Sequence, residues 1–180
     1  PPERQGEVYH RYILGVYALY GRLTAAFPKV LFESCASGGA RFDPGLLYYA
    51  PQTWTSDDTD AVERMKIQYG PSYVYPPGSV SAHVSAVPNQ QVGRSCPLET
   101  RGNVALFGVY GCELDLTALS PAEKETIRRQ TALSKRYGPL VRRGDFYRLL
   151  DPYRGSECAW MLVSPERREA LVGYYRLLVR

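Results

Sequence analysis

The stretch that decides the fold is Thr53–Arg64, with the sequence TWTSDDTDAVER. It follows the apolar run Leu46–Pro51, which we interpret as a strand, and it leads into a helical pattern. Three apolar residues of that pattern recur at i, i+3 and i+7: Val62, Met65 and Tyr69. The stretch therefore lies between the carboxyl end of a strand and the start of a helix, which is where α/β barrels place their chemistry.

Three carboxylates lie within this junction: Asp57, Asp58 and Asp60. Carboxyl groups this close together disfavour one another's ionised form, and an acid beside an aromatic ring such as Trp54 suits general acid catalysis. The same residues also fit an ordinary helix start, with Asp60 as N-cap and Glu63 as its capping-box partner. The two interpretations are compatible, because Asp60 can cap the helix while Asp57 does chemistry.

Helix and strand patterns alternate upstream of this stretch. Residues 7–27 carry one apolar stripe at helical spacing, which Pro28 ends, and they predict a helix. The short apolar run Val30–Phe32 then predicts a buried strand of the parallel type. The loop Ala36–Ala40 consists of small residues that let a ligand approach the backbone closely, but it lacks the lysine and the spacing of a phosphate-binding loop.

The same alternation continues downstream. Gly70–Pro71 ends the helix, Ser72–Tyr75 predicts a third strand, and a long polar loop follows. His83 lies in this loop, where it is either a candidate ligand contact or a structural, hydrogen-bonded histidine. A short helix over 99–107 then precedes a fourth strand over 109–116.

The clearest local signal is the tetrapeptide SPAE at 120–123, a capping box with proline at the first helical position. It predicts a helix that runs to Tyr137 and ends at Gly138–Pro139. Beyond it, short strands alternate with turns, as is typical of an antiparallel sheet. The expected strands cover 145–150, 159–163 and 170–179. We therefore divide the chain into an alternating α/β region, residues 1–143, and the start of an antiparallel β domain, residues 144–180.

Composition and charge exclude several function classes. The 22 Lys and Arg residues nearly balance 18 Asp and Glu, so the formal net charge is +4, without the concentrated basic patch of a nucleic-acid binder. No apolar run is long enough to cross a membrane and no signal peptide is visible, so we expect a cytoplasmic protein. The chain starts without Met, and a preceding segment could carry such a signal.

The cysteines do not form a metal-binding pattern, since none of the four belongs to a CxxC pair. They are Cys35, Cys96, Cys112 and Cys158. His10 and His83 lie far from them in sequence, so we expect neither a metal nor a cofactor. Four cysteines are ordinary for a reduced cytosolic protein, while a disulfide stays an open alternative with no spacing in its favour.

Three longer segments carry a family resemblance. Residues 32–43 read FESCASGGARFD, residues 54–64 read WTSDDTDAVER, and residues 82–89 read AHVSAVPN. Together with the tail from Gly144 through Trp160, they resemble glycoside hydrolase family 36, the α-galactosidases. The resemblance covers essentially the whole chain and implies a retaining α-galactosidase that acts on melibiose- or raffinose-type oligosaccharides. In such enzymes a (β/α)8 barrel precedes a C-terminal antiparallel β domain.

The resemblance also implies roles for individual residues. Asp57 matches the acid/base, and Trp54 lies on the same strand. The residues that match the loop lining the galactose pocket are Cys35, Ala36, Ser37 and Gly38. The chain departs from the family pattern in two ways. The family's nucleophile lies in a Lys-Trp-Asp motif on the fourth barrel strand, which is not found here, and the usual Cys-Ser-Gly-Gly-Gly-Gly is replaced by CASGGA at 35–40.

The predicted fold class is α/β, namely the C-terminal half of a (β/α)8 TIM barrel followed by the start of an antiparallel β domain. We count four strand–helix units, whereas a full barrel needs eight. Of the other carboxylates at strand ends, we assign Glu33 a buried supporting role and Glu113 and Asp115 structural or turn roles.

Because the nucleophile motif is missing, we expect the isolated chain to be inactive. The alternatives are a galactosyl-transferring family member, of the raffinose-type synthase kind, and a non-catalytic sugar-binding fragment. We further expect an α-galactoside oligosaccharide as substrate and a homo-oligomer for the full-length protein.

Overall fold

Four short strands run parallel to one another, in the order in which the chain forms them. The computed structural model describes residues 2–35, 37–38 and 40–178. β1 (Glu33–Ser34) pairs with β2 (Gln52–Thr53), and β3 (Ser81–Ser85) pairs with β4 (Val109–Glu113). A single parallel bridge from Thr53 to Val80 links the two pairs.

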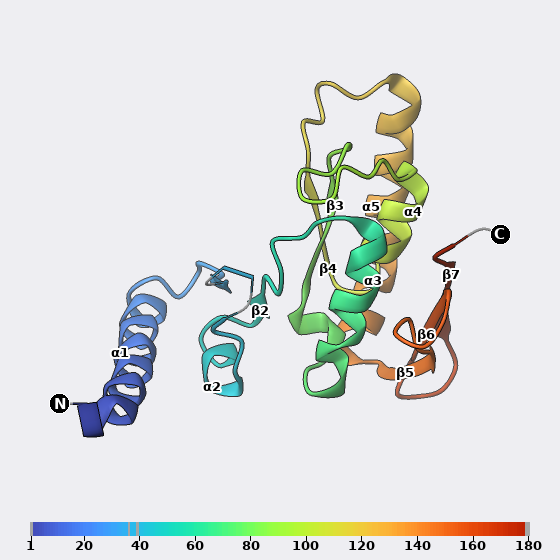
Figure 1. Ribbon diagram of the computed structural model, residues 1–180. Helices are drawn as coiled ribbons and strands as arrows, with labels where there is room; N and C mark the ends of the chain where they lie inside the picture. The colour runs from blue at the N-terminus through green and yellow to red at the C-terminus, as the bar shows by residue number, and fades with distance from the viewer. Residues whose placement is uncertain (1, 36, 39, 179–180) are drawn as a thin grey trace.

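Helices precede, separate and follow these strands. They are η1 (Pro2–Arg4), α1 (Gln5–Ala26), α2 (Pro44–Leu47), α3 (Ala61–Tyr69), η2 (Pro71–Tyr73), η3 (Pro77–Ser79), α4 (Leu98–Ala105) and α5 (Pro121–Arg143). In Figure 1, α3, α4 and α5 lie next to β3 and β4, whereas α1 stands apart near the N-terminus. Ala82 and Val84 on β3 are fully buried against Leu98 of α4 and Ile127 of α5. One face of the strand pair is thus closed by helices.

A second sheet follows, and it is antiparallel. β5 (Asp145–Leu150), β6 (Glu157–Val163) and β7 (Ala170–Arg176) pair in that order. Trp160 on β6 is 1% exposed and lies between Phe107, Phe146 and Tyr175. The same apolar cluster includes Met65 of α3, so this sheet packs against the helices that flank β3 and β4.

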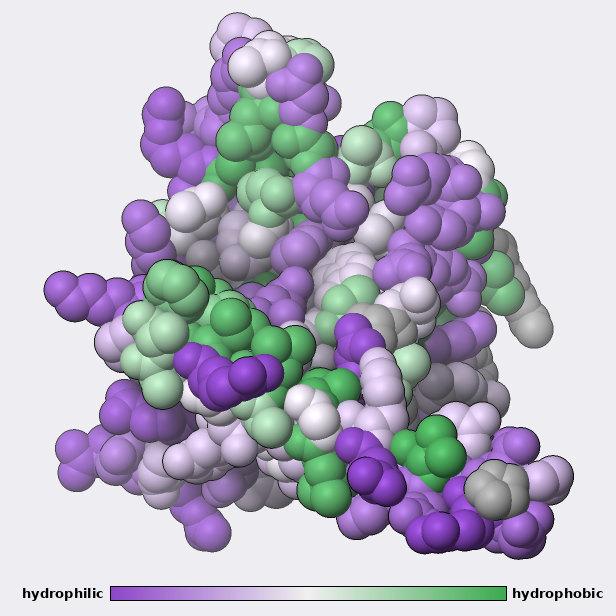
Figure 2. Space-filling model, turned by 90° about the vertical axis from the view of Figure 1, so that its left-hand side faces the viewer, coloured by the Kyte–Doolittle hydropathy of each residue, from purple (hydrophilic) through white to green (hydrophobic). Residues whose placement is uncertain are grey.

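α1 contrasts with the other long elements because none of its residues is fully buried. Four members of its predicted stripe are half-buried: Ile13, Val16, Tyr20 and Leu23. The other two members of the stripe, Tyr9 and Phe27, are exposed, and so are Val8, Tyr12, Leu14 and Leu19. Figure 2, viewed from the side on which α1 lies, shows green apolar patches among the polar surface. Within the described residues, no helix is both long and apolar enough to pass through a membrane.

Several elements form where the sequence predicts them. Asp60 caps α3, since its carboxylate accepts hydrogen bonds from the backbone N–H groups of Val62 and Glu63. The Glu63 side chain does not complete the capping box, and its carboxylate contacts Arg94 instead. The capping box at Ser120 is present in full, and α1, α4, β4 and the antiparallel sheet also lie where we expect them.

Three strand predictions are wrong. Val30 and Leu31 are exposed, and the strand they were expected to form is only Glu33–Ser34. The run Leu46–Pro51 begins inside α2, because Asp43 caps that helix through the N–H of Leu46 and Pro44 occupies its first turn. The strand there is Gln52–Thr53.

The third wrong prediction placed the strand too early in the chain: a strand was expected at 72–75 and a loop after it. Ser72–Tyr75 begins within the 3-10 helix η2, and the expected polar loop contains the buried strand β3. The sequence SAHVS has few residues with strong strand propensity, so only its burial between neighbours reveals it.

α5 does not end at Gly138–Pro139 but continues to Arg143. A proline inside a helix removes one backbone hydrogen bond and costs about 3 kcal/mol or more. The last turn offsets this cost by burying Leu140 and Val141 in the cluster around Trp160.

Candidate functional site

The face of the parallel strands that is turned away from the helices is polar. Because side chains alternate along a strand, Glu33, Gln52 and Ser81 share this face, opposite to Ala82 and Val84. Gln52 donates to the Glu33 carboxylate at 2.7 Å, and the Ser81 hydroxyl donates to the same oxygen. Glu33 is therefore an exposed hub of hydrogen bonds across three strands rather than the buried residue we expected.

A layer of rings and charges follows toward the carboxyl ends of the strands. The Trp54 ring stacks on the His83 ring with centroids 4.6 Å apart and planes 22° apart. Nδ1 of His83 lies 3.4 Å from the Glu113 carboxylate. A Cβ at Gly111 would lie 2.7 Å from the His83 ring, so glycine there leaves room for the imidazole. His83 is thus held in a wall of the site, between Trp54 and β4.

The three aspartates have different surroundings. Asp57 is exposed, and its carboxylate has no hydrogen-bond partner among the described residues. Asp58 accepts a hydrogen bond from the N–H of Asp60 at 3.0 Å. Asp60 is buried, caps α3 and pairs with Arg94. Among the described residues, Asp60 is thus engaged as a structural cap, whereas the Asp57 side chain is exposed and makes no such bond.

The small-residue loop after β1 lies directly against Asp57. A Cβ at Gly38 would be 3.1 Å from Cα of Ser56 and 3.3 Å from the backbone nitrogen of Asp57. The φ of Gly38 is +74°, a conformation that favours glycine, and Ser37 also has a positive φ of 57°. Cys35 is half-buried at the start of this loop, whereas Ala36 lies outside the described residues. The structure thus brings Gly38 and Asp57 together from two different strand ends.

Sequence reasoning missed a second loop that holds the aspartate segment. The loop over 86–97, which follows β3, reaches it at three points. Asn89 donates to the Thr59 hydroxyl at 2.8 Å, Gln91 donates to the carbonyl of Asp57 at 2.6 Å, and Arg94 contacts Asp60. The sequence signals for this loop were its length and polarity and the motif at 82–89, which ends at Asn89, but no contact with the aspartates was predicted.

Arg64 ends the stretch that decides the fold, but the sequence predicted no role for it. It is 2% exposed, and its Cζ lies 4.7 Å from the centroid of the Trp54 ring. Burial lowers the pKa of its guanidinium to about 10, although Asp58 and Glu113 act in the opposite direction. The group therefore keeps its positive charge at neutral pH.

The remaining strand-end carboxylate, Asp115, has the turn role that we expected. It accepts hydrogen bonds from the hydroxyl and the N–H of Thr117 at 2.6 and 2.8 Å. These bonds, from the side chain first, lower the pKa of the Asp115 carboxyl.

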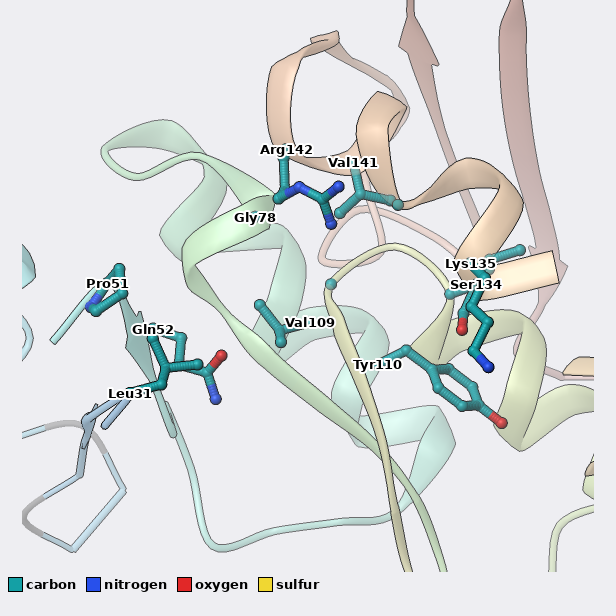
Figure 3. A pocket seen from close by; sticks show the side chains of 13 residues that line it. Leu31, Pro51, Gln52, Gly78, Val109, Tyr110, Ser134, Lys135, Val141 and Arg142 are labelled. Carbon is teal, nitrogen blue, oxygen red and sulfur yellow. The ribbon is translucent and has the colours of Figure 1, made fainter. Parts of the chain in front are cut away.

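Another cavity lies at the amino ends of the strands. It has a volume of about 610 Å³ and is bordered by Gln52, Val109 and, on α5, Ser134, Lys135 and Arg142 (Figure 3). None of its described lining residues is a carboxylate, so it lacks the groups that glycoside hydrolysis requires. A smaller cavity of about 120 Å³ lies at the carboxyl ends, between Thr59, Ser85, Gln90 and Glu113.

The described residues contain no cluster of three or more metal-ligating side chains. All four cysteines are free, so the disulfide alternative is not present in this structure.

Comparison with known proteins gives a consistent family assignment. The family model for melibiase matches residues 1–144. The α-galactosidase AgaA of Geobacillus stearothermophilus is 59% identical over 178 residues, which are 99% of this chain and 24% of that protein. The α-galactosidase Mel36A of Lactobacillus acidophilus is 48% identical over 172 residues, 96% of this chain and 23% of that protein.

Solved structures agree with these matches. A crystal structure of an AgaA variant from Geobacillus stearothermophilus in complex with raffinose has a TM-score of 0.94 at 58% identity, covering 100% of this chain and 25% of that one. The α-galactosidase from Lactobacillus brevis has a TM-score of 0.94 at 53% identity, with 100% and 24% covered. The chain spans about a quarter of the length of the curated relatives it matches. It belongs to the melibiase family, the α-galactosidases of glycoside hydrolase family 36.

Proposed function

We propose that this chain supplies the acid/base side of a retaining α-galactosidase site, with Asp57 as the acid/base. The substrates are terminal α-galactosyl residues of melibiose- or raffinose-type oligosaccharides. The observation that carries the proposal is the exposed carboxylate of Asp57, which has no hydrogen-bond partner among the described residues and belongs to the segment against Gly38, at the carboxyl ends of parallel strands. Crystal structures of AgaA variants with raffinose and with stachyose support the substrate class.

We further propose that residues 1–143 form the C-terminal half of a (β/α)8 barrel and that residues 144–180 begin an antiparallel β domain. The parallel order of β1 to β4, with helices between them, supports the first part. The outer edges of β1 and β4 have no strand partner among the described residues, as expected where further barrel strands join.

Asp57 acts in both halves of the reaction. It first donates its proton to the glycosidic oxygen while a carboxylate nucleophile attacks the anomeric carbon, and the leaving sugar departs as an alcohol. It then accepts a proton from water, which attacks the galactosyl-enzyme and releases galactose. Gly38, Ser37, Cys35 and Trp54 contribute to the walls that hold the galactosyl ring.

The nucleophile must approach from the opposite side of the sugar, about 5 Å from the acid/base. Glu33 is occupied by hydrogen bonds from Gln52 and Ser81, and Asp115 is occupied by Thr117. We therefore propose that the nucleophile comes from a strand outside these 180 residues and that the isolated chain does not hydrolyse α-galactosides. Turnover of an aryl α-galactoside by the purified chain, abolished by Glu113→Gln, would contradict this.

The acid/base assignment is tested in a chimera, in which this chain replaces the corresponding segment of AgaA from Geobacillus stearothermophilus. Asp57→Asn should lower turnover of melibiose by about 10²–10⁴-fold. A dinitrophenyl α-galactoside needs little acid assistance, so its first step should be nearly unaffected. Azide, which needs no general base, should then restore turnover by forming galactosyl azide.

Asp58→Asn is the matched control, because it removes one negative charge at the adjacent position. Asp58→Asn should not slow melibiose more than the dinitrophenyl α-galactoside, and azide should not raise its turnover. If Asp57→Asn lowers the turnover of melibiose and of the dinitrophenyl α-galactoside by the same factor, the acid/base assignment fails.

Product analysis with an excess of sugar acceptor separates the alternatives. A galactosyl-transferring enzyme forms oligosaccharides through the same galactosyl-enzyme, whereas a hydrolase releases galactose. Calorimetric binding of galactose without turnover in the chimera would support a sugar-binding role instead.

We also propose a cytoplasmic homo-oligomer for the complete enzyme. The four free cysteines support a location in a reducing compartment. The exposed apolar side chains of α1 support the proposal that this helix packs against protein outside these 180 residues.

A further inference from the structure

A buried arginine lies underneath the segment that carries Asp57. Arg64 is on α3, one turn after the N-cap Asp60, and its backbone N–H bonds to the Asp60 carbonyl. Side chains of a helix point back toward its N-terminus, so the guanidinium reaches under residues 54–60. Arg64 is 2% exposed, so its contacts are with the protein and not with bulk solvent.

The guanidinium connects three parts of the site. Nη1 donates to the carbonyl of Ser56 at 3.3 Å, and Nη2 donates to the carbonyl of Ser81 at 2.6 Å. Its Cζ lies 4.7 Å from the Trp54 ring, whose other stacking partner is His83 at 4.6 Å. One side chain thus ties the residue before Asp57, the strand β3 and the aromatic wall together.

We infer that Arg64 is a positioning residue for the acid/base: it fixes the Ser56 carbonyl and the Trp54 ring and thereby sets where the Asp57 carboxylate meets the glycosidic oxygen. This inference rests on the proposed function. No direct contact between Arg64 and substrate is required, because Arg64 acts through the backbone immediately before Asp57.

The geometry requires arginine in particular. Its planar fork donates in two directions at once, to carbonyls on two different segments, and its face lies on an aromatic ring. A lysine ammonium is a compact charge that can serve one carbonyl but cannot bridge both and stack as well. Arg64→Lys therefore keeps the charge but removes the bridge.

The chain offers a matched control in Arg101 on α4. It is also buried, at 7% exposed, and its Nη1 donates to a carbonyl at a strand end, that of Ser85, at 2.6 Å. Burial lowers the pKa of Arg101 as well. Arg101 does not bond to the residue before Asp57. Arg101→Lys should therefore lower the stability of the fold, as Arg64→Lys does, but should not displace the Asp57 carboxylate.

The test uses the chimera and the ratio of kcat/KM for a dinitrophenyl α-galactoside to that for melibiose. This ratio does not depend on how much of the protein is folded, because both substrates report on the same active fraction. Misplacing a catalytic group by about 1 Å costs on the order of 10²-fold. We expect Arg64→Lys and Arg64→Gln to raise the ratio at least about tenfold by slowing melibiose, and Arg101→Lys to leave it within about twofold.

Two results would overturn the inference. If Asp57→Asn raises the ratio but both Arg64 variants lower the two substrates equally, Arg64 is merely structural and the proposed function stands. If Asp57→Asn itself leaves the ratio unchanged, the proposed function fails and the inference fails with it.

Discussion

α1 and α5 are nearly equal in length, with 22 and 23 residues, yet they are held in very different ways. α5 buries five residues: Thr126, Ile127, Gln130, Leu140 and Val141. α1 buries none, although it carries more large apolar side chains. The contrast extends to their surroundings, since α5 borders both apolar clusters and α1 contributes to neither.

The difference teaches that an apolar pattern shows which surfaces need a partner, not which partner is present. Apolar residues occur on more than one side of α1, and a helix that is apolar on several sides is usually buried on several sides. One side packs on its own region, where Tyr20 meets Phe32 and Tyr17 meets Tyr49, each with ring centroids 6.1 Å apart. The other side remains exposed within the described residues.

The largest effect is expected at Trp160, in the apolar cluster that also contains Leu140 and Val141 of α5. Trp160→Ala should lower the free energy of unfolding by about 3–5 kcal/mol, because it opens a cavity between Phe107 and Tyr175. Urea unfolding followed by circular dichroism measures it. Tyr147→Ala, at an exposed position of the same sheet, should cost below about 1 kcal/mol. Equal losses in the two variants would mean that Trp160 is not at the centre of a core.

A smaller effect is expected at the start of α5. Ser120 accepts a hydrogen bond from the N–H of Glu123, so Ser120→Ala should destabilise the chain by about 1 kcal/mol. Ser134→Ala is the matched control, since Ser134 lies inside the same helix and bonds only to the Thr131 carbonyl. Alanine is the better helix former there, so the control should be neutral or slightly stabilising. Loss of stability in the control alone would contradict the role of the cap.

The same cap predicts a pH dependence. Hydrogen bonds from the Ser120 hydroxyl and then from its N–H lower the pKa of the Glu123 carboxyl in the folded chain. A lowered folded-state pKa gives stability that is present above the unfolded-state pKa and is lost as the pH falls through the folded-state pKa. Stability should therefore decrease between about pH 5 and pH 3, and part of that slope should vanish in Glu123→Gln. Ser120→Ala should flatten the same slope, since it removes the first cause of the shift. An unchanged slope in both variants would show that another group is responsible.

Local sequence signals predicted where helices start better than which residues they pack against. The N-caps Asp60 and Ser120 can each be recognised from four consecutive residues, and the structure confirms both. The strand Ser81–Ser85 could not be recognised, because its small and polar residues are defined by burial among neighbours. The continuation of α5 past Pro139 likewise depends on Leu140 and Val141 meeting a distant sheet.

The candidate site divides in the same way. The aspartate segment and the glycine loop were found from sequence, and the structure places Gly38 against Asp57. Arg64 and Asn89 lie at the ends of two quoted motifs, but no role was predicted for them, because their hydrogen bonds go to carbonyl and hydroxyl groups supplied by other segments. Every residue has a backbone carbonyl, so the sequence does not show which carbonyl a distant side chain will meet.

The last test of the comparison makes one substitution in both helices, and its result at Leu14 of α1 is the smallest effect that we expect. Leu14 on α1 is 50% exposed and Leu140 on α5 is 5% exposed. Leu140→Ala should cost about 2–5 kcal/mol, whereas Leu14→Ala should change the stability of this chain by less than about 0.5 kcal/mol. In the chimera the outer side of α1 should be covered by the rest of the enzyme, so Leu14→Ala should then cost more than about 1 kcal/mol, as for a newly buried leucine. Urea unfolding of the chain and of the chimera measures the two values. A large cost in the isolated chain would break the comparison, because α1 would already be packed there. A negligible cost in both would show that this side of α1 faces solvent in the complete enzyme and that its apolar residues have no packing role.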